Sequence, residues 1–248
     1  MTSANVWCVV PAAGVGKRFG SALPKQYLPL LDKTVCEHTL ERLLQLREIR
    51  RIVVCLSPED TQFSKLNIAN NPRIHTTLGG AERCHSVLNG LKALQPDARD
   101  TDWVLVHDVA RPCLRPDDVR KLLQQVEAAG AIGGILANPV RDTMKRSNAQ
   151  NQILETVCRN QLWHALTPQL FRLGQLRDAL ESALAENALV TDESSALERA
   201  GHQPLLVEGH PDNIKITHPQ DLPLAALFIQ QQLSPQSSNL QPIPQENP

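Results

Sequence analysis

Short runs of β-branched and apolar residues alternate with amphipathic stretches along the first half of the chain. We interpret these runs as strands buried on both faces of a parallel sheet. The runs that we assign as strands are Val6–Val10, Arg51–Leu56, Arg73–Leu78 and Trp103–Asp108. Alternating strands and helices predict βαβ units and therefore an α/β fold with a mostly parallel sheet.

Three stretches after these strands carry leucine and valine at helical spacing. Residues three, four and seven positions apart share one face of a helix, so each stretch predicts a helix that packs on the sheet. The three sets are Leu40, Leu43 and Leu44; Val87, Leu88, Leu91 and Leu94; and Val119, Leu122, Leu123 and Val126. Pro116 followed by two aspartates is typical of the start of the third helix, and Gly130 indicates its end.

The alternation stops at Asn138–Asn160, where two extended pieces flank a polar turn at Ser147–Gln152. We interpret this segment as a β-hairpin arm that projects from the domain, with a plain surface hairpin as the alternative. A lone hairpin is marginally stable in water, so a long one needs a surface to pack on. Beyond it we expect a helix at Leu173–Leu184, a short helix from Asp192, strands near Leu205–Val207 and Ile214–Thr217, and a last helix at Leu222–Leu233.

Length and composition predict one domain with a tail. The chain has 248 residues, and we expect residues 1–233 to form a single α/β domain. Residues 234–248 are rich in proline, glutamine, serine and asparagine, which predicts disorder. The net charge of -1 offers no basic surface for nucleic acid or for a membrane. Six cysteines without a C-x-x-C pair, and a start that lacks signal-peptide features, favour a cytoplasmic protein with reduced thiols.

The segment after the first strand, VVPAAGVGKRFGSALPKQYLPL, has the character of a phosphate-binding loop. Gly14 and Gly16 allow main-chain N–H groups to approach a phosphate closely. Phe19 breaks both the dinucleotide fingerprint and the P-loop pattern. The cations Lys17, Arg18 and Lys25 indicate a more highly charged ligand, such as a triphosphate that loses pyrophosphate. A basic, solvated surface loop is the alternative.

Further candidate residues follow other predicted strands, where ligands of α/β sheets collect. Two glycines precede Arg83 and Ser86 at a helix start, although an ordinary capped helix would look the same. Asp108 ends a central strand, a position from which a carboxylate can hold Mg²⁺ or cap the next turn. Asp212 and Lys215 add another carboxylate and another cation. This set suits nucleotidyl transfer. The sequence has neither the G-x-S-x-G motif of serine hydrolases nor the H-E-x-x-H motif of zinc hydrolases.

The chain resembles the 2-C-methyl-D-erythritol 4-phosphate cytidylyltransferase family in seven ordered motifs spread from about Val6 to Leu233. They are PAAGVGKRFG…PKQYLPL, GGAERCHSV, VHDVARP, PVRDTMK, RNQLWHALTPQ, TDESSALE and EGHPDNIKIT. The resemblance implies a Rossmann-like fold and a reaction of CTP with methylerythritol phosphate in non-mevalonate isoprenoid precursor biosynthesis. It also implies Mg²⁺ as cofactor and a homodimer in which the hairpin arm of each subunit reaches the neighbour's site.

The same resemblance implies roles for matching residues. Arg18 and Lys25 would offset charge at the transition state, and Asp108, with Asp212 nearby, would handle Mg²⁺ or the acceptor hydroxyls. Lys215 would be a further catalytic residue, on the acceptor side of the site. The expected nucleotide-binding residues are Ala12, Ala13, Gly14, Gly80, Arg83 and Ser86. The expected acceptor-binding residues are Arg111, Thr143, Arg159 and Thr191.

The sequence departs from the family pattern at Ala81, where an acidic residue is common, and at Cys158, where aspartate often precedes the matching arginine. The first departure affects a nucleotide contact and the second a detail of the arm. Two rival functions remain at this point: a related ribitol 5-phosphate cytidylyltransferase, and a non-catalytic sugar-nucleotide sensor. The segments DTMK and LWHALTPQ favour the methylerythritol enzyme over the ribitol enzyme, and the joint presence of Arg18, Lys25, Asp108 and Lys215 speaks against a sensor.

Overall fold

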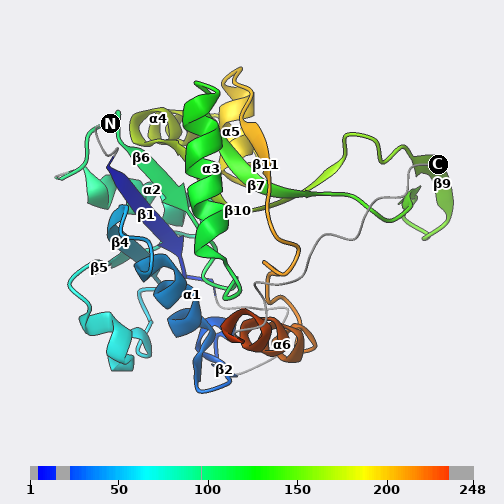
Figure 1. Cartoon of the computed structure of the whole chain (residues 1–248). Coiled ribbons are helices and arrows are strands. Elements are labelled where there is room, and N and C mark those ends of the chain that lie inside the picture. The colour runs from blue at the N-terminus through cyan, green and yellow to red at the C-terminus, as the bar shows by residue number, and fades with distance from the viewer. Residues whose placement is uncertain (1–4, 15–22, 96, 235–248) are drawn as a thin grey trace.

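A seven-stranded sheet with helices on both faces forms the body of the protein, and a long hairpin extends from it (Figure 1). The computed structural model describes residues 5–14, 23–95 and 97–234. The strands are β1 (Val6–Pro11), β4 (Ile49–Leu56), β5 (Ile74–Leu78), β6 (Trp103–Val106), β7 (Gly133–Pro139), β10 (Trp163–Arg172) and β11 (Leu205–Glu208). Their order is β11-β7-β10-β6-β1-β4-β5. Only β10 runs antiparallel to its neighbours within this sheet, which confirms the mostly parallel α/β fold.

Strand β1 shows why a continuous apolar run was needed. Val6, Cys8 and Val10 face one hydrophobic core, whereas Trp7 and Val9 face the other. Successive side chains of a strand point to opposite faces, so a strand covered on both sides requires apolar residues at every position. Helices α1 (Val35–Leu44) and α3 (Pro116–Ala128) contribute to the first core, and α2 (Arg83–Leu94), α4 (Leu173–Ala185) and α5 (Glu193–Arg199) contribute to the second.

The helices are α1 (Val35–Leu44), α2 (Arg83–Leu94), α3 (Pro116–Ala128), α4 (Leu173–Ala185), α5 (Glu193–Arg199) and α6 (Asp221–Leu233). Each of them was predicted from the sequence, and the first three by the helical spacing of their apolar residues. Helix α3 has Pro116 in its first turn, and Gly130 adopts a positive φ of 57° just past its end. Asp192 caps α5 by accepting a hydrogen bond from the main-chain N–H of Ser195. Three 3₁₀ turns, η1 (Lys25–Tyr27), η2 (Phe63–Lys65) and η3 (Asn67–Asn70), and a short ribbon of β2 (Pro29–Leu30) and β3 (Lys33–Thr34) complete this part of the chain.

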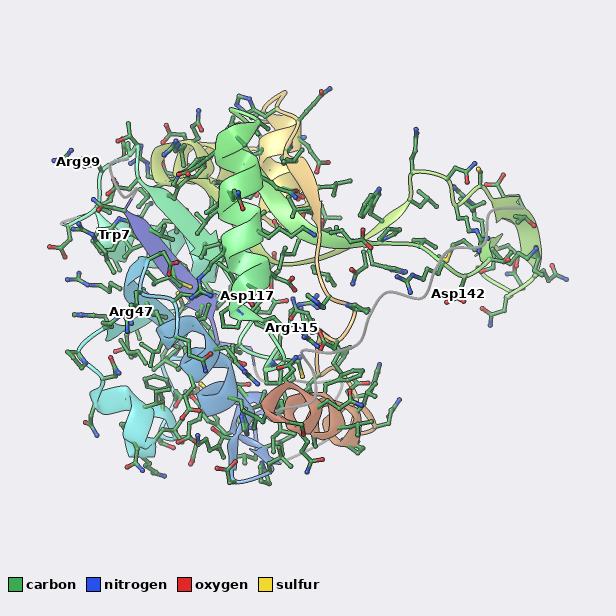
Figure 2. All side chains as sticks on the ribbon, in the orientation of Figure 1. Trp7, Arg47, Arg99, Arg115, Asp117 and Asp142 are labelled. Atoms are coloured by element: carbon green, nitrogen blue, oxygen red, sulfur yellow. The ribbon has the colours of Figure 1, made fainter. Side chains whose placement is uncertain are left out.

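The predicted hairpin is confirmed as a two-stranded arm of β8 (Met144–Ser147) and β9 (Ile153–Val157). The arm extends as a two-stranded ribbon from the end of β7 and the start of β10, away from the body of the protein (Figure 1). Asp142 lies in the segment between β7 and β8 (Figure 2). Its surface includes Ile153 and Leu154, whose side chains are 66% and 62% exposed. These exposed apolar residues leave the arm without a core of its own in the isolated chain.

Several predicted elements were wrong or missing. Residues Ile214–Thr217 do not form a strand, because Ile216 makes a single main-chain bond to the carbonyl of Ala110 and no ladder. Strand β5 lies at the edge of the sheet and is not buried on both faces, and its Leu78 is 62% exposed. Strands β7 and β10 were not predicted. The glycine pair of β7 and the polar residues of β10 lack the apolar pattern that marks the other buried strands.

No helix in the parts of the chain that the structure describes is long and apolar enough to cross a membrane. The predicted tail, apart from Ser234, lies outside the described residues.

Candidate active site

A pocket opens at the carboxyl ends of β1, β5 and β6, where the sequence predicted the chemistry to lie. Three chain segments form most of its wall, and Lys25, Gln26 and Lys215 close it from other parts of the chain. The lining residues are Pro11, Ala12, Ala13, Gly14, Lys25, Gln26, Gly80, Ala81, Glu82, Arg83, Ser86, Asp108, Val109, Ala110 and Lys215. Nine of these were predicted as site residues. Arg18 lies outside the described residues.

One wall of the pocket is built from small residues and main chain. An added Cβ on Gly79 would lie 2.4 Å from the Cβ of Ala13, so these two segments touch too closely for a side chain. The Ser86 hydroxyl accepts a hydrogen bond from the main-chain N–H of Gly80 at 3.0 Å. The side-chain amide of Gln26, which the sequence reasoning missed, donates to the carbonyl of Ala12 at 2.9 Å. These contacts hold the wall in place and keep it narrow.

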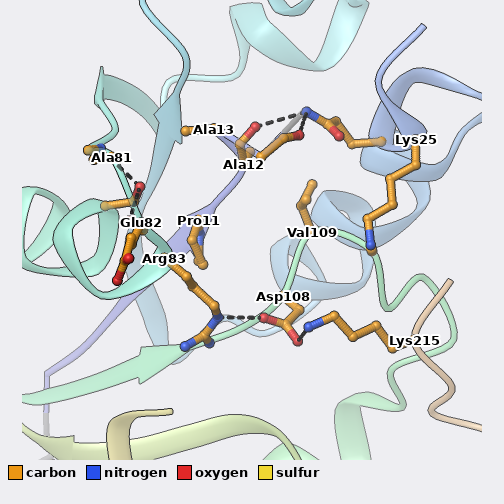
Figure 3. A pocket seen from close by; sticks show the side chains of 15 residues that line it. Pro11, Ala12, Ala13, Lys25, Ala81, Glu82, Arg83, Asp108, Val109 and Lys215 are labelled. Carbon is orange, nitrogen blue, oxygen red and sulfur yellow. Dashed lines mark hydrogen bonds and ion pairs between the residues drawn. The ribbon is translucent and has the colours of Figure 1, made fainter. Parts of the chain in front are cut away.

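Asp108 is the charged centre of the opposite wall. It is buried, and its two oxygens take different partners: Oδ1 accepts from Arg83 Nε at 3.0 Å, and Oδ2 lies 2.9 Å from Lys215 Nζ (Figure 3). Arg111 Nε also reaches Oδ2, at 3.4 Å. Burial by itself would raise the pKa of this carboxyl, but the three positive charges hold the pKa far below its ordinary value. Asp108 is therefore an ionised anchor for cations and not a general base.

A chain of hydrogen bonds behind Asp108 fixes its main chain. The carbonyl of Arg111 can only accept, so His107 Nε2, at 3.2 Å from it, carries the proton. His107 Nδ1 then accepts from the Thr167 hydroxyl at 3.0 Å, and that hydroxyl oxygen accepts from the Asp108 N–H at 3.1 Å. Burial lowers the pKa of His107 to about 4, which keeps the ring neutral at pH 7 and agrees with this single tautomer.

Arg83 lines the pocket, but its guanidinium is occupied by protein carboxylates. Besides the bond to Asp108, its two terminal nitrogens bind the two oxygens of Glu193 at 2.6 and 3.0 Å. Glu193 is 1% exposed and comes from the TDESSALE motif, but its place beside the pocket was not predicted from the sequence. In this arrangement the side chain joins two buried carboxylates, and the nucleotide-binding role of Arg83 stays a prediction.

Lys25 enters the pocket from η1. Its Nζ donates a 2.9 Å hydrogen bond to the main-chain carbonyl of Ile216, the residue after Lys215. The two lysines therefore lie on adjoining walls of the same pocket (Figure 3). The positive charges beside ionised Asp108 suit the phosphates of a ligand, and the narrow main-chain wall suits a planar ring. Together they favour a nucleoside phosphate.

The remaining predicted residues lie outside the pocket lining. Arg111 is buried behind it and donates to the carbonyl of Asn213 at 2.8 Å. Thr143 and Arg159 lie at the base of the arm, where the Arg159 guanidinium donates to the carbonyl of Arg141. Thr191 is exposed just before α5.

Asp212 lies outside the pocket lining, and its role in a metal site stays a prediction. Its Oδ2 accepts from Arg115 Nη2 at 2.6 Å and from the side chain of Gln232 at 2.9 Å. Arg115 lies between the start of α3 and α6 (Figure 2), so Asp212 links these two helices. Asp212 and Lys215 are three residues apart, yet their side chains have different partners: Asp212 binds Arg115, whereas Lys215 binds Asp108.

One group of described residues could bind a metal ion of a different kind. Glu82, Cys84 and His85 each place a donor atom within 4.8 Å of the others at the start of α2. A sulfur, nitrogen and oxygen set suits zinc, whereas Mg²⁺ prefers oxygen ligands alone. Burial raises the pKa of the Cys84 thiol, which disfavours the thiolate form that binds metals. This group is no candidate for the magnesium ion implied by the resemblance.

Comparison with known proteins agrees with the motifs and the fold. Residues 6–231 match the family described as IspD: 2-C-methyl-D-erythritol 4-phosphate cytidylyltransferase. The enzyme of that name from Tolumonas auensis is 56% identical over 224 residues, which cover 90% of this chain and 96% of the relative. A crystal structure of a 4-diphosphocytidyl-2C-methyl-D-erythritol synthase is 40% identical, with a TM-score of 0.79 over 91% of this chain and 99% of the solved one.

The cytidylyltransferase structure from Francisella tularensis is 36% identical, also with a TM-score of 0.79, and covers 91% of this chain and 100% of its own. Both solved chains are matched over nearly their full length. The chain belongs to the 2-C-methyl-D-erythritol 4-phosphate cytidylyltransferase family.

Proposed function

We propose that the pocket between the Ala12–Gly14 wall and Asp108 is where this protein carries out the reaction of its family. As a family member the protein is a nucleotidyltransferase that joins CTP and 2-C-methyl-D-erythritol 4-phosphate in isoprenoid biosynthesis. The products are 4-diphosphocytidyl-2-C-methyl-D-erythritol and pyrophosphate. The observation that carries the assignment of the site is the convergence of Lys25, Asp108 and Lys215, from three distant parts of the sequence, on one pocket.

The transfer of a cytidylyl group to a phosphate requires positive charge in the site more than it requires a general base. An oxygen of the acceptor phosphate attacks the α-phosphorus of CTP and forms a new phosphorus–oxygen bond. The bond from the α-phosphorus to the bridging oxygen breaks, and pyrophosphate leaves with its electron pair. The attacking phosphate is already anionic at neutral pH, so no proton has to be removed. The barrier lies in bringing two polyanions together, and positioned positive charge lowers it.

Lys25 and Lys215 are the described cations that we propose for this purpose, with Arg18 added on the strength of the family resemblance. Both lysines line the pocket, and each is oriented by a specific partner: Lys25 by the carbonyl of Ile216 and Lys215 by Asp108. Fixed charges of this kind need no reorganisation during the reaction, which is what makes them effective.

The small-residue wall suits the cytidine end of CTP. Ala12, Ala13, Gly14 and Gly80 allow a ring and a sugar to contact main chain, and Ser86 fixes the Gly80 segment. We propose that this narrow wall favours a pyrimidine over a larger purine. Arg83 remains part of the pocket in this proposal, as the holder of Asp108 and not as a direct phosphate ligand.

We further propose that the acceptor site is completed by a second subunit. Thr143 and Arg159, expected to contact the acceptor, lie at the base of the projecting arm and away from the pocket lining. The exposed apolar residues of the arm, such as Ile153 and Leu154, would be covered by a partner. Arg111 and Thr191 would complete the acceptor-binding set. A homodimer with exchanged arms accounts for both features.

A requirement for Mg²⁺ also belongs to this proposal. Both oxygens of Asp108 are bonded to protein cations, namely Arg83, Arg111 and Lys215. Asp212 binds Arg115 through Oδ2, and its Oδ1 is buried without a hydrogen-bond partner among the described residues. Mg²⁺ commonly binds through substrate phosphates with several waters retained. We therefore propose that CTP brings the ion, and none of the steps above depends on a protein ligand to it. A cytoplasmic location is likewise proposed, since all six cysteines are free and five of them are buried.

Pyrophosphate release tests this function. Purified protein would be mixed with CTP and, in separate reactions, methylerythritol phosphate, ribitol 5-phosphate or no acceptor. We expect release only with methylerythritol phosphate, and much slower release when ATP or GTP replaces CTP. Preference for ribitol 5-phosphate would transfer the protein to the related activity, and CTP binding without turnover would indicate a sensor.

A further inference from the structure

Glu193 is a fully buried carboxylate next to the pocket, although it does not line it. It begins α5, and the start of that helix is tightly held. Asp192 caps the helix, and Gln169 of β10 accepts from the main-chain N–H of Ser194 at 2.8 Å while donating to Asp192 at 2.8 Å. The backbone that carries Glu193 is therefore anchored to the central sheet.

From this anchor, four side chains of alternating charge lead into the pocket. Glu193 binds Arg83 through both carboxylate oxygens, Arg83 Nε binds Asp108 Oδ1 at 3.0 Å, and Asp108 Oδ2 binds Lys215 Nζ at 2.9 Å. Figure 3 shows the part of this array that runs from Arg83 through Asp108 to Lys215. Lys215 is its solvent-facing end, with 39% of the side chain exposed, whereas Asp108 is 8% exposed.

Arg83 binds Glu193 through its two terminal nitrogens and Asp108 through Nε alone, and this arrangement affects which oxygen of Asp108 is left for Lys215. A guanidinium and a carboxylate prefer a bidentate pair, in which two nitrogens take both oxygens. Arg83 makes that pair with Glu193 and is left with only Nε for Asp108. Without Glu193, Arg83 could form the bidentate pair with Asp108 and take the oxygen that Lys215 uses.

We propose that Glu193 is a positioning residue for cytidylyl transfer: by engaging both terminal nitrogens of Arg83, it keeps Arg83 away from Oδ2 of Asp108, the oxygen that Lys215 binds at 2.9 Å and that Arg111 also reaches at 3.4 Å. The inference rests on the proposed function, and in particular on the role of Lys215 at the pocket. Burial raises the pKa of Glu193, and the guanidinium of Arg83 opposes that rise, so the two groups stabilise each other's charged form.

A double-mutant cycle on turnover tests this. Glu193→Gln, Lys215→Ala and the double variant would be compared with wild type, with Glu198→Gln as the control, an exposed glutamate on the same helix. Glutamine can accept only through one oxygen, so it frees a nitrogen of Arg83. We expect kcat of Glu193→Gln to fall by about 10- to 100-fold, the size of effect that a misplaced group produces. KM for CTP should change less, and Glu198→Gln should match wild type.

The kcat of the double variant, compared with those of the two single variants, decides whether Glu193 acts through Lys215. If Glu193 acts through Lys215, adding Glu193→Gln to Lys215→Ala causes no further loss of kcat. A double variant that loses the product of the two single factors would overturn the inference, because Glu193 would then act independently. So would a Glu193→Gln variant as active as Glu198→Gln. Full activity of Lys215→Ala would contradict the proposed role of Lys215 as well, which separates failure of the function from failure of the inference.

A paired variant covers the case in which Glu193→Gln does not fold. Arg83→Met with Glu193→Gln removes the buried charges together, which proteins tolerate better than removing one. It also removes the guanidinium that competes for Asp108, so Lys215 keeps its partner. Because Arg83 also holds Asp108 in the pocket, we expect kcat to fall below that of wild type but to stay above that of Lys215→Ala. A loss as deep as that of Lys215→Ala would overturn the inference.

Discussion

The ammonium group of Lys25 donates a 2.9 Å hydrogen bond to the main-chain carbonyl of Ile216, a residue 191 positions further along the chain. Ile216 follows Lys215 directly, and its own N–H donates to the carbonyl of Ala110 at 2.8 Å. The segment that carries Lys215 is therefore held between η1 and the turn after β6. The two proposed cations share one piece of backbone, which sets their relative position in the pocket.

Replacing Lys25 with alanine should harm catalysis much more than folding. Loss of one charge-stabilising donor typically lowers turnover by about 10²–10³-fold. The lost hydrogen bond to Ile216 should cost only about 1 kcal/mol of unfolding free energy. Steady-state kinetics and thermal unfolding of Lys25→Ala would check this, with the exposed Lys65→Ala as control. A folded Lys25→Ala protein with normal kcat would exclude the role.

The shared acceptor site predicts complementation between two inactive variants. If Arg159 serves the partner's pocket, Lys25→Ala and Arg159→Ala homodimers should both be nearly inactive. In a mixed dimer one pocket carries both lesions and the other carries neither. With random pairing about half the dimers are mixed, and each has one intact pocket, so activity should recover to roughly a quarter of wild type.

The measurement is pyrophosphate release after the two variants are co-expressed or re-mixed, with mixed dimers verified by mass. Arg159 acting on its own chain's pocket leaves every pocket damaged, so no activity would return. That result, with mixed dimers present, would reject the exchanged arm.

His107 should make stability depend on pH below neutrality. Burial lowers the pKa of this ring from 6.5 to about 4. Between these two pH values the ring is therefore protonated in the unfolded chain but neutral in the native protein. The free energy of unfolding should therefore fall as pH falls from about 6.5 to 4, by roughly 3 kcal/mol from this group. Above pH 6.5 the ring is neutral in both states, so it no longer changes the free energy of unfolding with pH.

Urea unfolding at pH 7, 6 and 5 would test this in wild type, His107→Gln and the exposed His202→Gln. His107→Gln cannot take up the proton, so its stability should depend less steeply on pH, whereas His202→Gln should follow wild type. Equal slopes in all three proteins would show that His107 does not titrate in this way.

Gly90 in α2 should not tolerate even a methyl group. An added Cβ would lie 2.4 Å from Val9 Cγ1 and 2.9 Å from Cys55 Sγ. Alanine would favour the helix by about 1 kcal/mol, but overpacking a rigid core costs about 1–3 kcal/mol. We expect Gly90→Ala to be destabilised in denaturant unfolding, while the exposed Lys92→Ala on the same helix stays near wild type. A more stable Gly90→Ala would mean that α2 can move away from β1.

Local pattern was enough to predict much of this fold. The spacing of apolar residues within a segment shows which of its faces are buried. This local pattern predicted the strands β1, β4 and β6 and the helices α1, α2 and α3. End signals placed α3 and α5 correctly. The loops after β1, β5 and β6 were also predicted as the site, since parallel strands deliver their carboxyl ends to one edge. The motifs identified the family, which the comparisons then confirmed.

Tertiary structure alone decided which groups meet. Strand β10 escaped prediction because its place between β6 and β7 is set by long-range pairing, while its own sequence is polar at several positions. Asp212 and Lys215 are three residues apart, yet one binds Arg115 and the other Asp108. Glu193 reaches Arg83 across 110 positions. Such partners depend on how helices and loops pack around the sheet, and spacing along a chain carries no record of that packing.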